Sequence, residues 1–271
     1  MTASGHPTHP TPSSSRSGSR SRPRLTRNVA PGVHRLEHAH VNLYLIDDGT
    51  AGVTLVDAAF PDTWMPLRLA LEAIGRHPRD VRALVLTHAH FDHVGVAARL
   101  RAEWGVPVWV HEDDRRLAAH PYRYRHERSR LLYPLTHPRA VPVLGAMARA
   151  GALRVKGVPF AETVPESGTL DVPGRPRVVR SPGHTDGHIG LHLPERDALL
   201  TGDALVTLDP YTGLTGPQIV AGAATADSAT ALRSLDALAA TDARIVLPGH
   251  GDPLRTGIRA AAEAARAAGA H

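Results

Sequence analysis

The chain has 271 residues, of which 42% are hydrophobic and 21% charged, a composition typical of a soluble globular protein with a sizeable core. It contains no cysteine, which excludes disulfides, thiolate metal sites and a cysteine nucleophile, so any metal must be held by nitrogen and oxygen donors. No apolar run approaches the roughly 18 residues of a membrane span, and the N-terminus lacks the apolar segment of a secretory signal. We therefore expect a cytoplasmic protein without membrane contact.

Residues 1–27 form a Ser/Pro/Arg-rich tail with five arginines and no acidic residue. We expect this tail to be disordered, because it has too few large apolar groups to offset the entropy lost on ordering. It accounts for the whole formal charge of +5, so residues 28–271 are formally neutral and we expect no nucleic-acid partner. A transit peptide, a start codon assigned too far upstream, and weak contact of the tail with nucleic acid are the alternatives.

From Val29 onward, short β-branched runs alternate with helical patterns. The predicted strands are Val41–Ile46 and Thr54–Asp57, which form a hairpin, then Val81–Leu86, Val106–Val110, Arg177–Arg180, Ile189–Leu193, Ala198–Leu200 and Arg244–Leu247. The predicted helices are Trp64–Ile74, His93–Trp104, Ser228–Ala239 and a terminal helix. Residues 111–150, rich in Arg, His and Tyr, are interpreted as a helical lid. Strands grouped with flanking helices predict an α/β layered architecture but do not give the strand order.

The segment Thr87–His93, which reads THAHFDH, follows the predicted strand Val81–Leu86 and holds three imidazoles and a carboxylate within six positions. His88 and His90 lie two residues apart, so an extended chain places both on one face. Asp92 and His93 begin the next helix and point elsewhere, so we expect the run to serve two neighbouring ions. Imidazole and carboxylate donors together suit zinc or a similar first-row ion.

Three later segments carry a polar residue in a glycine-flanked loop after a predicted strand. They are Pro182–His188, Thr201–Asp203 and Pro248–Gly251. Each is a candidate source of further ligands. His188 is left outside the ligand set, because a structural hydrogen bond explains a histidine at that position at least as well.

In chain order, Asp57, the Thr87–His93 segment, His184, Asp203 and His250 resemble the five-motif signature of the metallo-β-lactamase superfamily. The resemblance spans most of residues 41–251. It implies one hydrolase domain over residues 28–271, with an α/β fold of the four-layer αβ/βα sandwich type and the metals at one edge of the two sheets.

The resemblance also implies a role for each residue. The ligands are His88, His90 and His184 for one ion, Asp92, His93 and His250 for the other, and Asp203 as a bridge between them. A hydroxide that bridges the two ions would be the nucleophile, so Asp203 and Asp92 are the catalytic carboxylates, and Asp92 would pass a proton to the leaving group. Asp57 would orient the motif loop by hydrogen bonds. Zinc is the expected metal, with iron or manganese as alternatives.

Several branches of that superfamily fit the residues poorly. The absence of cysteine excludes the cysteine-dependent zinc β-lactamases, and Asp203 disfavours the branch without a bridging carboxylate. No inserted domain of the RNA-processing kind is evident, and only 21 residues follow His250, too few for the glutathione-binding domain of glyoxalase II.

We therefore predict a di-metal hydrolase of a carboxylic ester, lactone or thioester that acts on a small-molecule substrate. The alternatives are a phosphodiesterase or nuclease on the same di-metal site, and an iron-dependent persulfide dioxygenase. Tyr211, in a Gly/Pro-punctuated loop after Asp203, is predicted to hydrogen-bond a substrate oxygen. The sequence gives neither the physiological substrate nor the oligomeric state.

Overall fold

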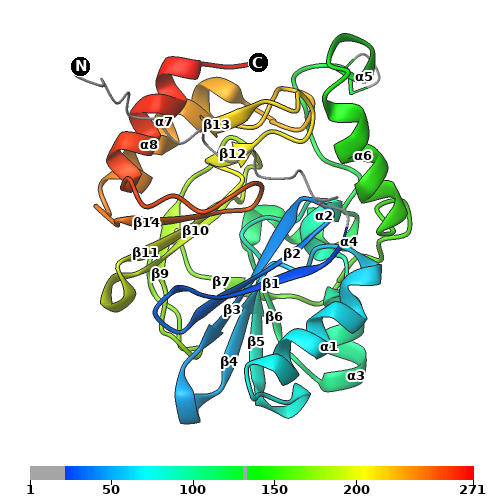
Figure 1. Ribbon diagram of the computed structural model, residues 1–271, viewed down its shortest axis with the longest axis vertical. Coiled ribbons are helices and arrows are strands. Elements are labelled where there is room, and N and C mark those ends of the chain that lie inside the picture. Colours follow the sequence, from blue (N-terminus) through cyan, green and yellow to red (C-terminus); the bar gives the residue numbers. More distant parts are fainter. Residues whose placement is uncertain (1–21, 131–132) are drawn as a thin grey trace, which may run out of the picture.

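In the computed structural model, which describes residues 22–130 and 133–271, two larger β-sheets lie face to face (Figure 1). The first sheet follows chain order, with strands β1 Arg24–Ala30, β2 Val33–His38, β3 Val41–Asp47, β4 Val53–Val56, β5 Val81–Val85, β6 Val108–His111 and β7 Glu162–Val164. The second has the order β14 Ile245–Pro248, β11 Ala198–Gly202, β10 Ile189–Leu193, β9 Arg177–Arg180 and β8 Gly168–Thr169. A separate antiparallel pair is formed by β12 Val206–Leu208 and β13 Thr215–Gln218.

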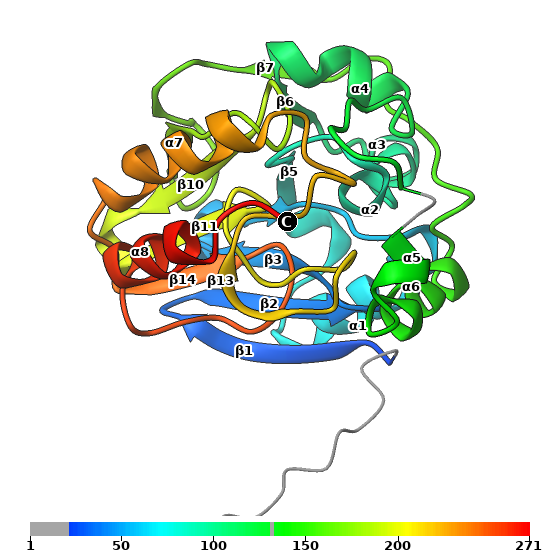
Figure 2. The same ribbon diagram turned by 90° about the horizontal axis from the view of Figure 1, so that it is seen from above.

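Helices cover the outer sides of both sheets, as the view from above shows (Figure 2). The described helices are α1 Trp64–Ala73, α2 Phe91–Val94, α3 Ala97–Trp104, α4 Arg115–Ala119, α5 Tyr133–Thr136, α6 Ala140–Arg149, α7 Ser228–Ala239 and α8 Ile258–Ala268. The longest of them, α7, has 12 residues, and no helix of the described residues is long and apolar enough to cross a membrane.

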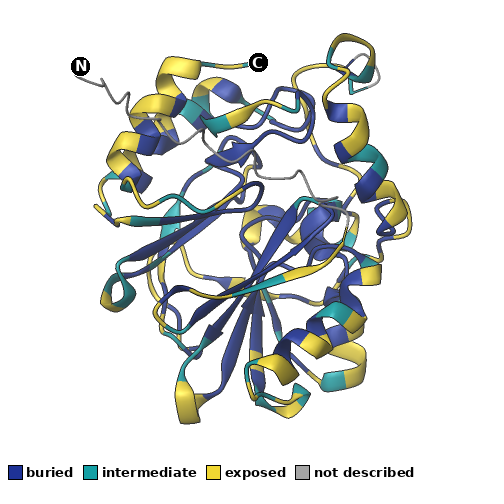
Figure 3. Cartoon of the chain, viewed as in Figure 1, coloured by how far each residue is buried: buried dark blue, intermediate teal, exposed yellow. Residues whose placement is uncertain are grey.

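Successive side chains along the strands enter different cores, which shows that the fold has four layers. In β3, Leu43 and Leu45 belong to the core under α1 and α3, whereas Tyr44 and Ile46 belong to the core between the sheets. In β11, Leu199 faces the core under α7 and α8. The sheets are therefore buried on both faces, as the burial colouring shows (Figure 3), and the predicted αβ/βα sandwich is confirmed.

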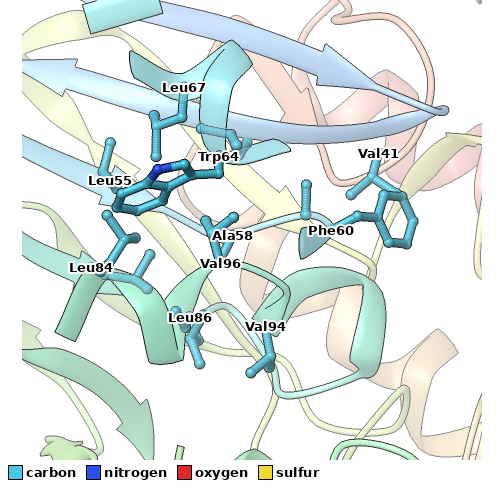
Figure 4. Packing of buried hydrophobic residues seen from close by; sticks show 14 of the residues in the cluster. Val41, Leu55, Ala58, Phe60, Trp64, Leu67, Leu84, Leu86, Val94 and Val96 are labelled. Carbon is cyan, nitrogen blue, oxygen red and sulfur yellow. The ribbon is translucent and has the colours of Figure 1, made fainter. Parts of the chain in front are cut away.

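The core between the first sheet and its helices is built around Trp64 of α1. Figure 4 shows Trp64 close to Leu55 of β4 and Leu84 of β5, with Leu67 of the same helix beside it. Leu55, Leu67 and Leu84 are fully buried. Burying a side chain of this size contributes roughly 1.5–3 kcal/mol to stability, so α1 is fixed mainly by this contact.

The prediction of one continuous helix over His93–Trp104 is wrong. Gly95 and Val96 separate α2 from α3, because their amide N–H groups donate to the carbonyls of Ala59 at 2.9 Å and Ala58 at 3.1 Å. The bonds that would continue the helix are thus replaced by bonds to the loop after β4. The two short helices leave the metal-motif residues at the sheet edge.

The tail boundary also needs correction. Residues 24–27, placed in the disordered tail, belong to β1, whose Leu25 pairs with Leu36 of β2 and packs against the core. The rest of that prediction, residues 1–21, lies outside the described residues. The segment interpreted as a helical lid begins with the last residue of β6 and contains α4, α5 and α6, although residues 120–130 are irregular and residues 131–132 lie outside the described residues.

We expect Gly95→Ala to destabilise the fold by about 3 kcal/mol, because a Cβ at this position would lie 2.1 Å from the carbonyl oxygen of Ala59 and 2.3 Å from the Cα of Phe60. Urea unfolding measures the change in free energy. The matched control is Gly145→Ala, within α6, where the nearest atom to the new Cβ is the end of a flexible arginine at 3.5 Å. Equal stability of the two variants would contradict this account.

Candidate metal centre

The predicted ligands lie where strands of the two sheets end. The motif segment follows β5, whose parallel neighbour β4 leads into Asp57. In the second sheet, β11 leads into Asp203, and its parallel neighbour β14 leads, through Gly249, into His250. The backbone N–H of Asn42, near the start of β3, donates to the carbonyl of Gly249 at 2.8 Å and joins the two sheets at this edge. In open α/β sheets, ligands bind at the carboxyl ends of the strands.

All seven predicted metal ligands come together there, and all are buried. Asp203 is central: its Oδ2 lies 3.2 Å from His250 Nε2, 3.5 Å from His184 Nε2 and 3.8 Å from His88 Nε2. Its Oδ1 lies 3.5 Å from His93 Nε2. One carboxylate therefore faces donors from both predicted ligand sets.

Two groups of donor atoms match the predicted sets, and a third group, His88, His93 and Asp203, joins them. In the first, His90 Nδ1 faces His184 Nε2 at 3.0 Å, and both group with His88 within 4.8 Å. In the second, Asp92 Oδ2 lies 3.4 Å from His250 Nε2 and 4.0 Å from His93 Nε2. The roles of these residues as ligands stay predictions, but their positions match those roles.

Several of these donor atoms are buried without a hydrogen-bond partner among the described residues. They are His88 Nε2, His93 Nε2, His250 Nε2 and Asp203 Oδ1. An unpaired buried polar atom costs about 1–3 kcal/mol, so a native protein rarely gathers several at one point. Imidazole nitrogens and carboxylate oxygens that converge in this way fit divalent metal ions.

The pKa shifts of the histidines also differ between the two ligand sets. Burial is the main cause that holds the pKa of His88 and His90 well below the ordinary value and lowers the pKa of His184 to about 4. These three rings are neutral, so they offer lone pairs. At the other end burial also opposes protonation, but Asp203 and the nearby carboxylates outweigh it, raising the pKa of His250 to about 10 and that of His93 well above its ordinary value. That end of the cluster favours positive charge.

Asp57 orients the motif loop and one of its histidines. Its Oδ1 accepts the backbone N–H of Thr87 at 2.8 Å, and its Oδ2 accepts the Thr87 hydroxyl at 2.9 Å. The same Oδ2 lies 3.0 Å from His93 Nδ1. A proton on Nδ1 completes this hydrogen bond and turns Nε2 of His93 to the centre, where a metal ion would take the place of the Nε2 proton; this is the usual arrangement behind a metal-binding imidazole.

His188 holds the backbone beside Asp203. Its Nε2 accepts the backbone N–H of Asp203 at 3.0 Å and of Ala204 at 3.2 Å, so its proton lies on Nδ1 and is donated to Ser181 Oγ at 2.9 Å. In the sequence, its place two residues after Asp186 indicated only that a structural hydrogen bond was one explanation for this histidine. His188 is thus a support of the central carboxylate, which sequence reasoning left open.

Asp114 ties two ligand loops together, and the sequence did not predict it. Its carboxylate accepts the backbone N–H of Ala89 at 3.0 Å, the hydroxyl of Thr185 at 2.8 Å and the backbone N–H of Gly187 at 2.9 Å. The first lies in the motif segment and the others follow His184. Burial raises the pKa of Asp114 to about 6, against the lowering effect of these hydrogen bonds. In the sequence it reads as one of several acidic residues at the start of a helix.

The loop that carries His250 is fixed by side chains of the first sheet. Asn42 donates to the carbonyls of Pro248 and Gly251, each at 2.8 Å, and Tyr44 donates to the carbonyl of Pro248 at 2.8 Å. Because these donors lie on β3, the position of a ligand from the second sheet depends on contact with the first.

Tyr211 lies beside the cluster rather than within it. Its hydroxyl is 3.1 Å from that of Tyr124, whose ring centroid lies 4.2 Å from that of His90. Burial, followed by Tyr124, raises the pKa of Tyr211 well above its ordinary value, so its phenol keeps its proton. Its contact with a substrate oxygen stays a prediction.

Comparisons with known proteins agree with this geometry. A family model described as the metallo-beta-lactamase superfamily matches residues 37–250. The probable metallo-hydrolase YflN of Bacillus subtilis is 27% identical over 238 residues, which cover 83% of this chain and 86% of that protein. A hydroxyacylglutathione hydrolase of Cereibacter sphaeroides is 31% identical over 162 residues, which cover 60% of this chain and 46% of that enzyme.

Solved structures are similar as well. The metallo-beta-lactamase family protein TTHA1429 from Thermus thermophilus has 30% identity and a TM-score of 0.61, over 86% of this chain and 77% of that one. TTHA1623, solved in a di-iron-bound form, has 27% identity and a TM-score of 0.54, over 81% of this chain and 92% of that one.

We expect Asp203→Ala to lose metal at both positions, because the carboxylate faces donors of both sets. Metal content after loading with zinc and dialysis, measured by mass spectrometry, checks this. The control is Asp186→Ala, which removes a carboxylate whose side chain is 58% exposed and lies outside the seven ligands. If Asp203→Ala keeps the full metal content of the parent chain, the shared-carboxylate arrangement is wrong.

We expect His188→Ala to destabilise the fold by about 3 kcal/mol, because two buried N–H groups lose their acceptor. Zinc affinity should fall about 10-fold, as for other residues that support metal ligands. Urea unfolding and competition with a chelator measure the two effects. His192→Ala, at a half-buried position four residues further along the chain, is the control and should leave zinc affinity unchanged. Unchanged affinity in both variants would show that His188 does not position Asp203.

Proposed function

The chain belongs to the metallo-beta-lactamase superfamily and is a metallo-hydrolase, and from this premise we propose that it cleaves a carboxylic ester, lactone or thioester with two divalent metal ions. The observation that carries the proposal is the arrangement around Asp203, where one buried carboxylate faces histidines of both ligand sets at 3.2–3.8 Å. A carboxylate shared between two donor sets supports a two-metal hydrolytic site.

His88, His90 and His184 would hold one ion, and Asp92, His93 and His250 the other, with Asp203 contacting both. Bound there, the two ions would lower the pKa of a water molecule so that it attacks a carbonyl near neutral pH, and would polarise that carbonyl. The imidazole-rich donor set supports zinc. Iron and manganese use the same donors, and the di-iron form of TTHA1623 supports iron as the first alternative.

The chain's own carboxylates have different environments. Asp203 is 3% exposed and surrounded by imidazoles, so its role is to fix the ions. Asp92 is 6% exposed, and its Oδ2 is 3.4 Å from His250 Nε2. We assign the proton transfer to Asp92, whose carboxylate would take a proton from the attacking water and give it to the leaving group. The phenol of Tyr211, which keeps its proton, would donate to a substrate oxygen.

The size of the space beside the cluster supports a small substrate. A cavity of about 360 Å³ is lined by His184, Thr185 and Tyr124 among others, and this volume lies in the range of small-molecule sites. The hydroxyacylglutathione hydrolase relative supports a thioester, although the match spans less than half of that enzyme.

The test is the initial rate of the zinc-loaded protein on a lactone, a thioester, an aryl ester and a phosphodiester. We expect turnover of carboxyl substrates alone, with kcat/KM lowered at least roughly 10³-fold in Asp203→Ala. Turnover of the phosphodiester alone would favour a phosphodiesterase or nuclease. Failure on all four, with oxygen uptake by the iron-loaded protein on a persulfide, would favour a persulfide dioxygenase.

A further inference from the structure

The cavity beside His184 is rich in arginine. Its wall includes Arg116 at α4 and Arg123 and Arg125 on the irregular segment that follows. His184 and Tyr124 also line it, so the cavity adjoins the metal-ligand cluster rather than a remote surface. A substrate whose carbonyl lies at the cluster would extend past these guanidinium groups.

Most charged groups of the cavity already have partners. Arg125 pairs with Asp186 at 3.0 Å, and Asp113 pairs with Arg180 at 3.1 Å. The carboxylate of Asp114 accepts three hydrogen bonds from the ligand loops. The acidic side chains that line the cavity are thus all engaged.

Arg116 and Arg123 differ from their neighbours, because among the described residues neither guanidinium has an ion pair or a hydrogen bond. By contrast Arg115, the neighbour of Arg116 on α4, pairs with Glu112 at 3.2 Å. Against these two cations stands one carboxylate without an ion pair in the described part of the chain, that of Asp114, so the cavity wall keeps a net positive charge. Guanidinium groups bind carboxylate and phosphate in a bidentate manner.

The segment that carries Arg123 is fixed relative to the cluster. The carboxylate of Glu127 accepts the backbone N–H of Ser228 at 2.8 Å and its hydroxyl at 2.6 Å, and the amide of Glu127 donates to the carbonyl of Thr225 at 3.0 Å. Tyr124, next to Arg123, packs its ring against that of His90. The backbone that carries Arg123 is therefore held beside the cluster, while its exposed guanidinium has no partner among the described residues.

We propose that Arg116 and Arg123 form a subsite for an anionic group, a carboxylate or phosphate, on the substrate. This inference rests on the proposed hydrolysis of a carboxyl bond at the metal centre and narrows its substrate class to esters or thioesters that carry negative charge. The two guanidinium groups lower KM for such substrates by pairing with the anion.

A matched pair of substrates tests the proposal. The acetyl thioesters of 3-mercaptopropionate and 3-mercaptopropionamide have nearly the same shape and differ in charge. We expect the zinc-loaded protein to prefer the carboxylate about 10-fold in kcat/KM, mainly through KM, and expect the preference to shrink at high salt. The acetyl thioester of 2-mercaptoethyl phosphate shows whether phosphate is preferred to carboxylate.

Substitutions locate the effect. Arg116→Gln and Arg123→Gln should each lower the preference about 3-fold, and the double variant should abolish it, while turnover of the amide stays unchanged. Arg115→Gln removes an equal charge from the same helix but lies outside the cavity, so it should keep the preference. Equal turnover of the two thioesters by the parent chain would overturn the subsite and leave the hydrolase proposal standing.

A binding measurement separates the two proposals. 5-Oxohexanoate and 5-oxohexanamide match the thioesters but have a methylene group in place of sulfur and so no thioester bond, and calorimetry gives their Kd values. If neither these thioesters nor the lactone and aryl ester are turned over, the proposed function fails, yet tighter binding of 5-oxohexanoate that is lost in the double variant still supports the subsite. Equal binding of both compounds would overturn it.

Discussion

A buried carboxylate among imidazoles is the constraint on which this structure depends. Asp203 is 3% exposed and lies within 3.8 Å of four histidine rings. Removing a carboxylate from water is costly unless positive charge lies close to it. Burial would raise its pKa, but His250 and His93 outweigh burial and hold the pKa of Asp203 well below its ordinary value. The fold must therefore bring loops from both sheets to one point.

Buried polar side chains hold the ligand loops at this point by hydrogen bonds. Asp57 binds the motif loop, Asp114 joins it to the loop after His184, His188 holds the backbone of Asp203, and Asn42 holds the loop of His250. Each joins segments that are far apart in the chain. Because each hydrogen bond is buried, its loss destabilises the fold as well as displacing a ligand. Stability and site geometry depend on the same residues.

The sequence predicted those parts of the fold that local pattern determines. The apolar run Val81–Leu86 predicted a strand end, and the glycine-flanked loops predicted candidate ligands. The assignment of each ligand to one of two sets came from resemblance to a family. Strand β2 was not predicted, because four of its six residues are polar or charged, although all six are buried. The break in the helix at Gly95 depends on a hydrogen bond to the carbonyl of Ala59. The role of Asp114 depends on hydrogen-bond donors about 25 and 70 residues away in the chain. Pattern within one segment cannot report such partners.

Chemistry and specificity are built on different parts of this molecule. The predicted ligands follow the ends of strands in the two large sheets, whereas Arg116 and Arg123 lie on a short helix and an irregular segment held by Glu127. Both arginine side chains are exposed, so they can be substituted without disturbing the buried neighbours Ala118 and Tyr124. A change at Arg123 would therefore alter which substrate the proposed subsite binds, while Asp203 and its neighbours keep their positions. The superfamily's shared metal centre is thus compatible with a substrate preference particular to this chain.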